Sequence, residues 1–262
     1  MDQRSLRTVA ATRYVTPFRE GGSLPGLVEA NDLGMYVLKF RGAGQGLKAL
    51  TAEIIVGELA RRLGFRVPEI VLVGLDPELS RAEPDEEIQD LLRASAGVNL
   101  GIDYLPGSFD FNPRVRDPGP DLAARLLWFD TLVLNVDRSW RNPNMLLWHR
   151  QAWLIDHGAS LIFHHRWAPG WTPAASYRYD ASEHVMMAAN PASVTEVDAE
   201  LRPRLTPALV DEVLALVPDD WLDPAFGSPE QVRAAYAAYF TARLADAPNW
   251  VAALEETRAA RV

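Results

Sequence analysis

Residues 135–148 have the sequence N-V-D-R-S-W-R-N-P-N-M-L-L-W, and the motif L-I-D-H-G follows at 154–158. The first segment comes directly after an apolar run, L-W-F-D-T-L-V-L, at 127–134. Within the ten residues 135–144 the chain then places one Asp, two Arg and three Asn. Each of these side chains needs a hydrogen-bonding or ionic partner, and binding and catalytic groups gather on loops held by a rigid element. This segment is therefore the first candidate for a functional site.

The bulk properties of the chain exclude several classes of protein. With 262 residues, of which 48% are hydrophobic and 23% charged, it has the composition of a soluble globular protein with one two-lobed domain or two small ones. A net charge of −9 argues against direct nucleic-acid binding. No apolar run approaches a membrane span, and the first residues lack a signal-peptide pattern, so we expect a cytoplasmic protein without membrane contact. The absence of cysteine excludes thiolate metal sites and cysteine nucleophiles.

The N-terminal part is expected to be rich in strands. Residue types and turn signals predict strands at 8–15, 27–30, 35–40, 69–74 and 99–105. The first three form an antiparallel meander in this prediction. Helical spacing predicts a helix at 51–63, and an acidic surface insertion with an amphipathic helix is expected at 76–93.

A loop at 107–120 marks the expected boundary between an N-lobe of residues 1–106 and a C-lobe of residues 107–262. The C-lobe is expected to be mainly helical. Its predicted elements are a helix at 122–134, a hairpin of strands 144–148 and 152–155, a long loop at 163–182, and helices at 207–216, at 230–244 and at the C-terminus.

The hairpin predicts a site for a hard cation. Asn144 begins one of its strands and Asp156 follows the other, so strand pairing brings the two side chains together. Carboxylate and amide oxygens are suitable ligands for Mg²⁺. Asp137 emerges at the end of the apolar helix, where it can orient a hydroxyl group or accept its proton. Positioning and charge neutralisation of this kind are what phosphoryl transfer requires.

A phosphoryl-transfer site also needs a cation for the nucleotide phosphates, and Lys39 in the strand Y-V-L-K-F is the candidate. An isolated buried ammonium group is costly, and Glu53, early in the following helix, can pair with it. Protein kinases use such a strand-lysine and helix-glutamate pair. Between the first two strands, Gly21, Gly22 and Ser23 can cover the phosphates with backbone N–H groups, although they lack the spaced G-x-G-x-x-G pattern.

Taken in order, these features resemble the HipA-like kinases. The resemblance rests mainly on the segment A-E-I-I-V-G-E-L-A-R-R-L-G-F-R-V-P-E at 52–69. The strand lysine, N-V-D-R…N at 135–144 and I-D-H-G at 155–158 also match the family pattern. The last two are also similar to the phosphatidylinositol-kinase pattern of D-R-x-x-x-N followed by D-F-G. The resemblance implies an α+β, two-lobed protein-kinase-like fold, with a small antiparallel N-lobe sheet and helix and a mainly helical C-lobe.

It also implies a kinase that uses ATP and Mg²⁺ and transfers the γ-phosphate to a hydroxyl acceptor, a protein Ser or Thr or a small molecule. In this scheme Lys39, Glu53 and Asp137 are catalytic, and Asn144 and Asp156 bind the metal. The usual five-residue gap after the catalytic Asp would select Asn142 in place of Asn144. His157 stands where the family relative has the Phe of D-F-G.

The resemblance further implies that adenine is held by the backbone of Asp103, Tyr104 and Leu105. Two other functions stay open at this level: a nucleotide-binding pseudokinase that acts as an interaction module, and a small-molecule or lipid kinase of the same fold. Some side chains also have ordinary structural interpretations. Arg138 can contact a phosphate or pair with an acid, Trp140 can shape the acceptor pocket, and His164 and His165 are expected to be solvated loop residues.

Overall fold

The strands of the N-terminal part close into a five-stranded barrel in the order β1-β2-β3-β5-β4. The structure is a computed structural model that describes residues 5–18, 24–113, 115–172 and 177–260. The barrel strands are β1 (Thr8–Pro17), β2 (Gly26–Ala30), β3 (Met35–Lys39), β4 (Ile70–Leu75) and β5 (Gly97–Asp103). The antiparallel pairs β1–β2 and β2–β3 agree with the predicted meander. A parallel pair, in which Thr8 lies opposite Leu72, closes the barrel and has no local signal in the sequence.

Strand β3 shows how the alternation of side chains places the strand lysine. Tyr36 and Leu38 are buried in the barrel, whereas Val37 and Lys39 lie on the opposite face and are partly exposed. Successive residues of a strand point to opposite faces, so one register fixes both sets. The barrel wall is tight beside this strand, because a Cβ on Gly101 would lie 2.5 Å from Val73 Cγ2.

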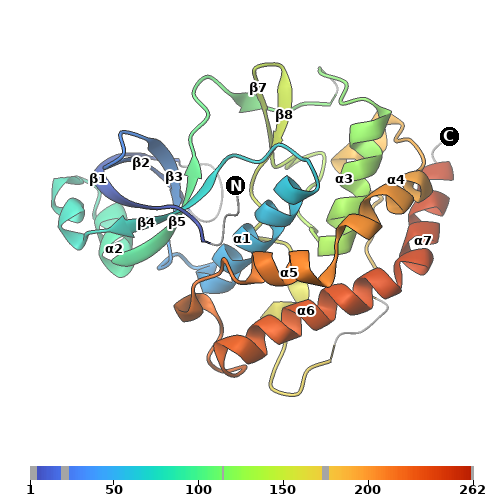
Figure 1. Cartoon of the computed structure of the whole chain (residues 1–262). Coiled ribbons are helices and arrows are strands. Elements are labelled where there is room, and N and C mark those ends of the chain that lie inside the picture. Colours follow the sequence, from blue (N-terminus) through green and yellow to red (C-terminus); the bar gives the residue numbers. More distant parts are fainter. Residues whose placement is uncertain (1–4, 19–23, 114, 173–176, 261–262) are drawn as a thin grey trace.

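Helix α1 (Gly46–Arg62) packs between the barrel and the helical lobe (Figure 1). It begins five residues before the predicted start at Thr51 and ends where predicted, ahead of Gly64, which has a φ of +94°. Its apolar residues, Ile54, Ile55 and Leu59 among them, are fully buried and belong to the same core cluster as the helical lobe. The helix therefore fixes the position of one lobe against the other. Helix α2 (Glu86–Ala94) lies in the predicted surface insertion.

The second lobe is mainly helical (Figure 1). Its helices are α3 (Pro120–Val133), α4 (Val194–Leu201), α5 (Pro207–Leu214), α6 (Pro229–Ala245) and α7 (Ala247–Ala259), and its strands are β6 (Phe109–Asp110), β7 (Met145–Trp148) and β8 (Gln151–Leu154). The hairpin β7–β8 has the predicted pairing, with Met145 opposite Leu154.

Two elements of this lobe differ from the prediction. Strand β6 lies in the segment predicted as loop and adds a short edge to the hairpin. Helix α4 was not predicted, although the sequence carries a signal for its start: the Ser193 side chain accepts a hydrogen bond from Glu196 N. We propose that the lobe boundary lies at 106–107, and the pairing of β6 with the hairpin of the second lobe supports this.

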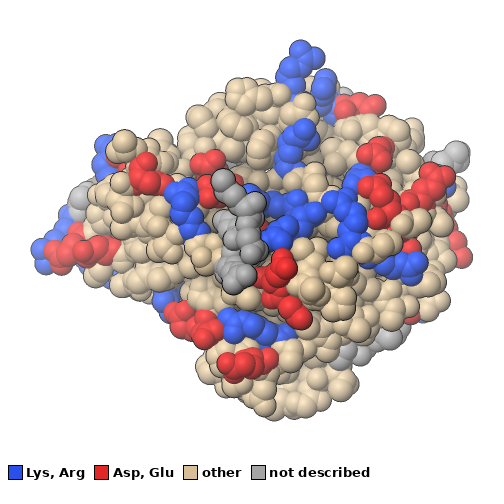
Figure 2. Space-filling view, viewed as in Figure 1, with Lys and Arg blue, Asp and Glu red and all other residues tan. Residues whose placement is uncertain are grey.

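The surface mixes both signs of charge. On the face shown in Figure 2, Lys and Arg side chains lie beside Asp and Glu side chains. Ion pairs between elements account for part of this mixture, such as Arg62 with Glu212 and Arg125 with Glu200. Among the described helices, none has the length and apolar character needed to cross a membrane.

Candidate active site

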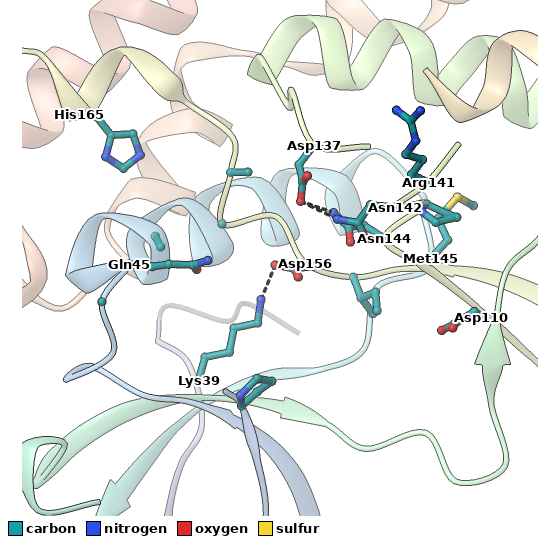
Figure 3. A pocket seen from close by; sticks show the side chains of 17 residues that line it. Lys39, Gln45, Asp110, Asp137, Arg141, Asn142, Asn144, Met145, Asp156 and His165 are labelled. Carbon is teal, nitrogen blue, oxygen red and sulfur yellow. Dashed lines mark hydrogen bonds and ion pairs between the residues drawn. The ribbon is translucent and has the colours of Figure 1, made fainter. Parts of the chain in front are cut away.

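A cavity of about 730 Å³ lies between the two lobes and is lined by five of the predicted site residues. Lys39 enters it from β3, and Asp137, Asn142 and Asn144 enter from the loop after α3 (Figure 3). Asp156 enters from the segment after β8. Residues more than 100 positions apart in the chain are thus brought to one place.

Lys39 joins the two lobes through its ammonium group. Its Nζ forms an ion pair with Glu53 of α1 and donates to Asp156 Oδ1 at 2.7 Å. Burial by itself lowers the pKa of Lys39, but the charges of Glu53 and Asp156 raise it above its ordinary value, so the lysine is protonated. For Asp156 the two effects have the opposite signs. Burial by itself raises the pKa of its carboxyl group, but the charge of Lys39 holds that pKa below its usual range.

Glu53 has a second role in this arrangement. Its side chain is 1% exposed, and its Oε1 also accepts the backbone N–H of Gly158 at 2.8 Å. The same oxygen therefore fixes both the lysine and the D-H-G segment. Asp156 is different, because its side chain is 48% exposed and faces the cavity. It is the carboxylate of this group that a ligand can reach.

Asn142 and Asn144 both donate to Asp137. Asp137 Oδ2 accepts from Asn142 Nδ2 at 2.8 Å and from Asn144 Nδ2 at 3.1 Å. Asn144 also lies beside Asp156, since Ile155 N donates to Asn144 O at 3.0 Å across the hairpin. Asn144 and Asp156 both have left-handed backbone conformations, with φ of +48° and +55°. Such values are uncommon for residues other than glycine and occur at sites where the surrounding structure imposes them.

A buried ionic network holds this loop. Arg138 is 1% exposed and donates to Asp130 Oδ2 at 2.7 Å, to Pro143 O at 3.1 Å and to Asn144 O. Asp130 also accepts from Asn135 and from His184 Nε2. Burial alone raises the pKa of Asp130, but the charge of Arg138 and the hydrogen bond from His184 hold it below its usual range. Of the two interpretations of Arg138, the structure selects pairing with an acid.

The network contains residues that the sequence analysis missed. The sequence contained one indication of Asp130, because a lone carboxylate inside an apolar run such as that of α3 requires a partner when it is buried. His184 left none, because it reaches Asp130 from 54 positions away. Its Nδ1 accepts the N–H of Met186, so the proton sits on Nε2 and is donated to Asp130.

Histidines 157 and 164 are buried and uncharged. Burial and the charge of Arg138 lower the pKa of His157 to about 3. This side chain packs against α1 at Gly57. The expectation that the histidines are solvated was wrong for His164, which is fully buried. Its Nδ1 lies 2.9 Å from the hydroxyl oxygen of Tyr236. His165 contacts it at 3.2 Å and lines the cavity.

The predicted nucleotide-binding residues have different outcomes. Gly21, Gly22 and Ser23 lie outside the described residues. Asp103, Tyr104 and Leu105 do not line the cavity, and the N–H groups of Asp103 and Tyr104 donate to the barrel carbonyls of Glu69 and Met35. Their role in adenine binding stays a prediction. Lining residues that were not predicted include Gly44, Gln45, Asp110 and Arg141. The glycine-rich stretch 42–46 was a signal for the first two.

The residues of the cavity fit a bound magnesium ion by their chemistry. Asp156 offers an accessible carboxylate, and Asn144, which lines the same cavity, carries an amide oxygen. Both are hard ligands of the kind Mg²⁺ takes. Within the described ranges no cluster of three or more His, Cys, Asp or Glu side chains could hold a metal by itself. A metal here would therefore need the asparagine oxygen and further ligands from a nucleotide.

Comparison with known proteins identifies the family. The family model of the HipA-like kinases matches residues 12–238, which is most of the chain. The chain belongs to the HipA-like kinase family. The predicted family and the two-lobed α+β fold are confirmed, and the class of activity is that of a kinase.

A solved kinase structure agrees with this fold. A Helicobacter pylori proinflammatory kinase, CtkA, superposes with a TM-score of 0.52 at 12% identity, over 89% of this chain and 92% of that one. A crystal structure of the Golgi casein kinase with Mn and ADP bound gives a TM-score of 0.47 at 12% identity, over 92% of this chain and 73% of that one. No curated protein sequence matches the chain. At 12% identity, the superposition on CtkA shows a shared fold and no more.

Proposed function

We propose that this HipA-like kinase binds ATP with Mg²⁺ and transfers the γ-phosphate to a hydroxyl group, with a protein Ser or Thr as acceptor. The observation that carries the proposal is the contact of Lys39 with both Glu53 and Asp156 in the cavity that also holds Asp137. An ammonium group held by two carboxylates is fixed and charged, which is what binding of the nucleotide phosphates requires.

Each side chain then has a role in the transfer. Lys39 contacts the phosphates, and Glu53 positions Lys39. Asp137 orients the acceptor hydroxyl and takes its proton as the new bond forms between the acceptor oxygen and the γ-phosphorus. The bond between that phosphorus and the β–γ bridging oxygen breaks, and ADP leaves with the electron pair. Asn142 and Asn144 keep the Asp137 carboxylate in place through their amide N–H groups.

The metal would be held by Asp156 and Asn144, with Asn142 as the second candidate. When bound, Mg²⁺ neutralises charge on the phosphate oxygens. Asn144 is favoured because it lies beside Asp156 across the hairpin, whereas Asn142 is exposed. The predicted adenine contacts of Asp103, Tyr104 and Leu105, and phosphate contacts of Gly21, Gly22 and Ser23, remain part of the proposal. A cytoplasmic location without membrane or nucleic-acid partners remains part of it as well.

Two measurements on the intact chain test the proposal against the pseudokinase alternative. The first is the thermal shift with ATP and Mg²⁺, and the second is γ-phosphate transfer to a protein acceptor or to water. We expect Asp137→Asn to reduce transfer by about 10²- to 10⁴-fold, the usual contribution of a general base, and to keep ATP binding. A nucleotide-induced shift without any Asp137-dependent transfer would favour the pseudokinase. Transfer to free sugars or lipids alone would favour the small-molecule kinase.

A further inference from the structure

The loop that carries Asp137 also carries an arginine whose charge is not neutralised. Arg141 lines the cavity, and among the residues that the structure describes no carboxylate lies within ion-pairing distance of it. Many other arginines of the surface are paired with a carboxylate, such as Arg13 with Glu29 and Arg233 with Asp219, and what distinguishes Arg141 from the remaining unpaired ones is its place at the cavity. Arg141 is therefore an available cation at the site where the acceptor hydroxyl must arrive.

A neutral partner holds this cation in place. The Arg141 guanidinium lies over the ring of Trp140, 4.3 Å from its centroid. Trp140 is 52% exposed, and its Nε1 donates to Glu183 Oε2 at 2.9 Å. The indole is thus fixed from one side while its face carries the guanidinium. A cation–π contact orients an arginine without cancelling its charge, so that less conformational entropy is lost when an anion binds.

The direction of Arg141 separates it from the nucleotide phosphates. Figure 3 shows the side chain beside Asn142, with its guanidinium directed away from Lys39 and Asp156. The phosphates are expected at Lys39 and Asp156, so Arg141 lies on the acceptor side of Asp137. Val136, on the other side of Asp137, is 59% exposed and contributes an apolar surface to the same loop.

We infer that Arg141, positioned by Trp140 and Glu183, selects acceptors with an anionic group close to the reactive hydroxyl, and that the acceptor is an acidic peptide segment. This inference rests on the proposed kinase function and adds the class of substrate. An extended peptide advances about 3.3 Å per residue, and an arginine side chain reaches over about two such steps. The acidic residue is therefore expected within one to three positions of the acceptor Ser or Thr.

The test uses synthetic peptides with one Ser and flanking residues that are all Ala, contain Asp or Glu, or contain Lys. With ATP and Mg²⁺, the wild-type chain should have a kcat/KM about three- to tenfold higher for the acidic peptides than for the Ala peptide, and added salt should reduce the difference. Arg141→Glu should remove this preference and favour the Lys peptide, with the KM for ATP unchanged. Arg150→Glu, an equal charge change at the exposed turn of the hairpin, should behave like the wild type.

Variants of the supporting residues separate positioning from folding. Trp140→Ala should weaken the preference for acidic peptides through KM, and Trp140→Phe, which keeps an aromatic face, should restore much of it. An Arg141→Glu variant that still prefers acidic peptides would overturn the inference, as would one whose KM for ATP rises with every peptide. Asp137-dependent ATP hydrolysis without transfer to any peptide would overturn the acidic-peptide acceptor but not the kinase. If the wild-type chain shows neither ATP hydrolysis nor phosphate transfer to any peptide, the proposed function itself is overturned.

Discussion

Replacement of Arg138 by Met tests whether the buried network holds the catalytic loop. The change removes a fully buried cation that donates to Asp130 at 2.7 Å and to the carbonyls of Pro143 and Asn144. Asp130, with 0% exposure, then keeps only its contacts with Asn135 and His184. Removal of one partner of a buried ion pair costs about 3–5 kcal/mol, because the other charge is left uncompensated.

Equilibrium urea unfolding measures this effect. We expect Arg138→Met to lower the free energy of unfolding by about 3–5 kcal/mol, a large share of the usual 5–15 kcal/mol. For a chain of this size the midpoint of thermal unfolding should fall by roughly 10 °C. The same variant should lower kcat, since two carbonyls of the loop lose their donor. The control is Arg141→Met, an exposed arginine of the same loop, which should change stability by no more than about 0.5 kcal/mol.

A double-mutant cycle identifies the partner. Asp130→Asn should be as destabilising as Arg138→Met, and the double variant should be more stable than the sum predicts by about 2 kcal/mol. Strict additivity, or a cost of Arg138→Met below about 1 kcal/mol, would refute the argument that this pair holds the loop.

Three further changes test separate parts of the structure. Asp156→Asn should weaken binding of ATP with Mg²⁺ by at least about 10- to 100-fold, because losing even an indirect metal contact has an effect of this size. The thermal shift that ATP causes without Mg²⁺ should change little. Burial lowers the pKa of His164 to about 3, below its unfolded value of about 6.5, so its contribution to stability is complete above pH 6.5 and is lost as the pH falls toward 3. His164→Gln should therefore reduce the pH dependence of the unfolding free energy in this range by up to about 1.4 kcal/mol per pH unit. Gly101→Ala should destabilise the barrel by about 1–3 kcal/mol, because its Cβ would meet Val73 Cγ2 at 2.5 Å and Val71 Cγ2 at 2.8 Å, whereas Gly74→Ala meets only Val9 O at 3.7 Å.

The residues that could be predicted from the sequence lie on regular elements in a fixed order. The family resemblance predicts that Lys39, on a strand, forms an ion pair with Glu53, on the next helix. The structure places the two side chains in contact. Asn144 and Asp156 meet because a hairpin of known register brings its ends together. Short-range pattern and strand pairing were sufficient for these positions.

The remaining features depend on contacts that no local pattern records. Barrel closure by β1 and β4 joins strands about 60 positions apart, and His184 reaches Asp130 across 54. The burial of His164 follows from packing against Tyr236, which is 72 residues later. The hydrogen bonds of Asn142 and Asn144 to the same oxygen of Asp137 are likewise not recorded by any local pattern.

A crystal structure with a non-hydrolysable ATP analogue and Mg²⁺ tests the central claim most directly. We predict that the phosphates contact Lys39, that the metal is bound by Asp156 and one of the two asparagines, and that the γ-phosphate faces Asp137. Nucleotide bound outside the cavity, or bound there with Lys39 and Asp156 both away from the phosphates and the metal, would contradict the assignment of this cavity as the phosphotransfer site.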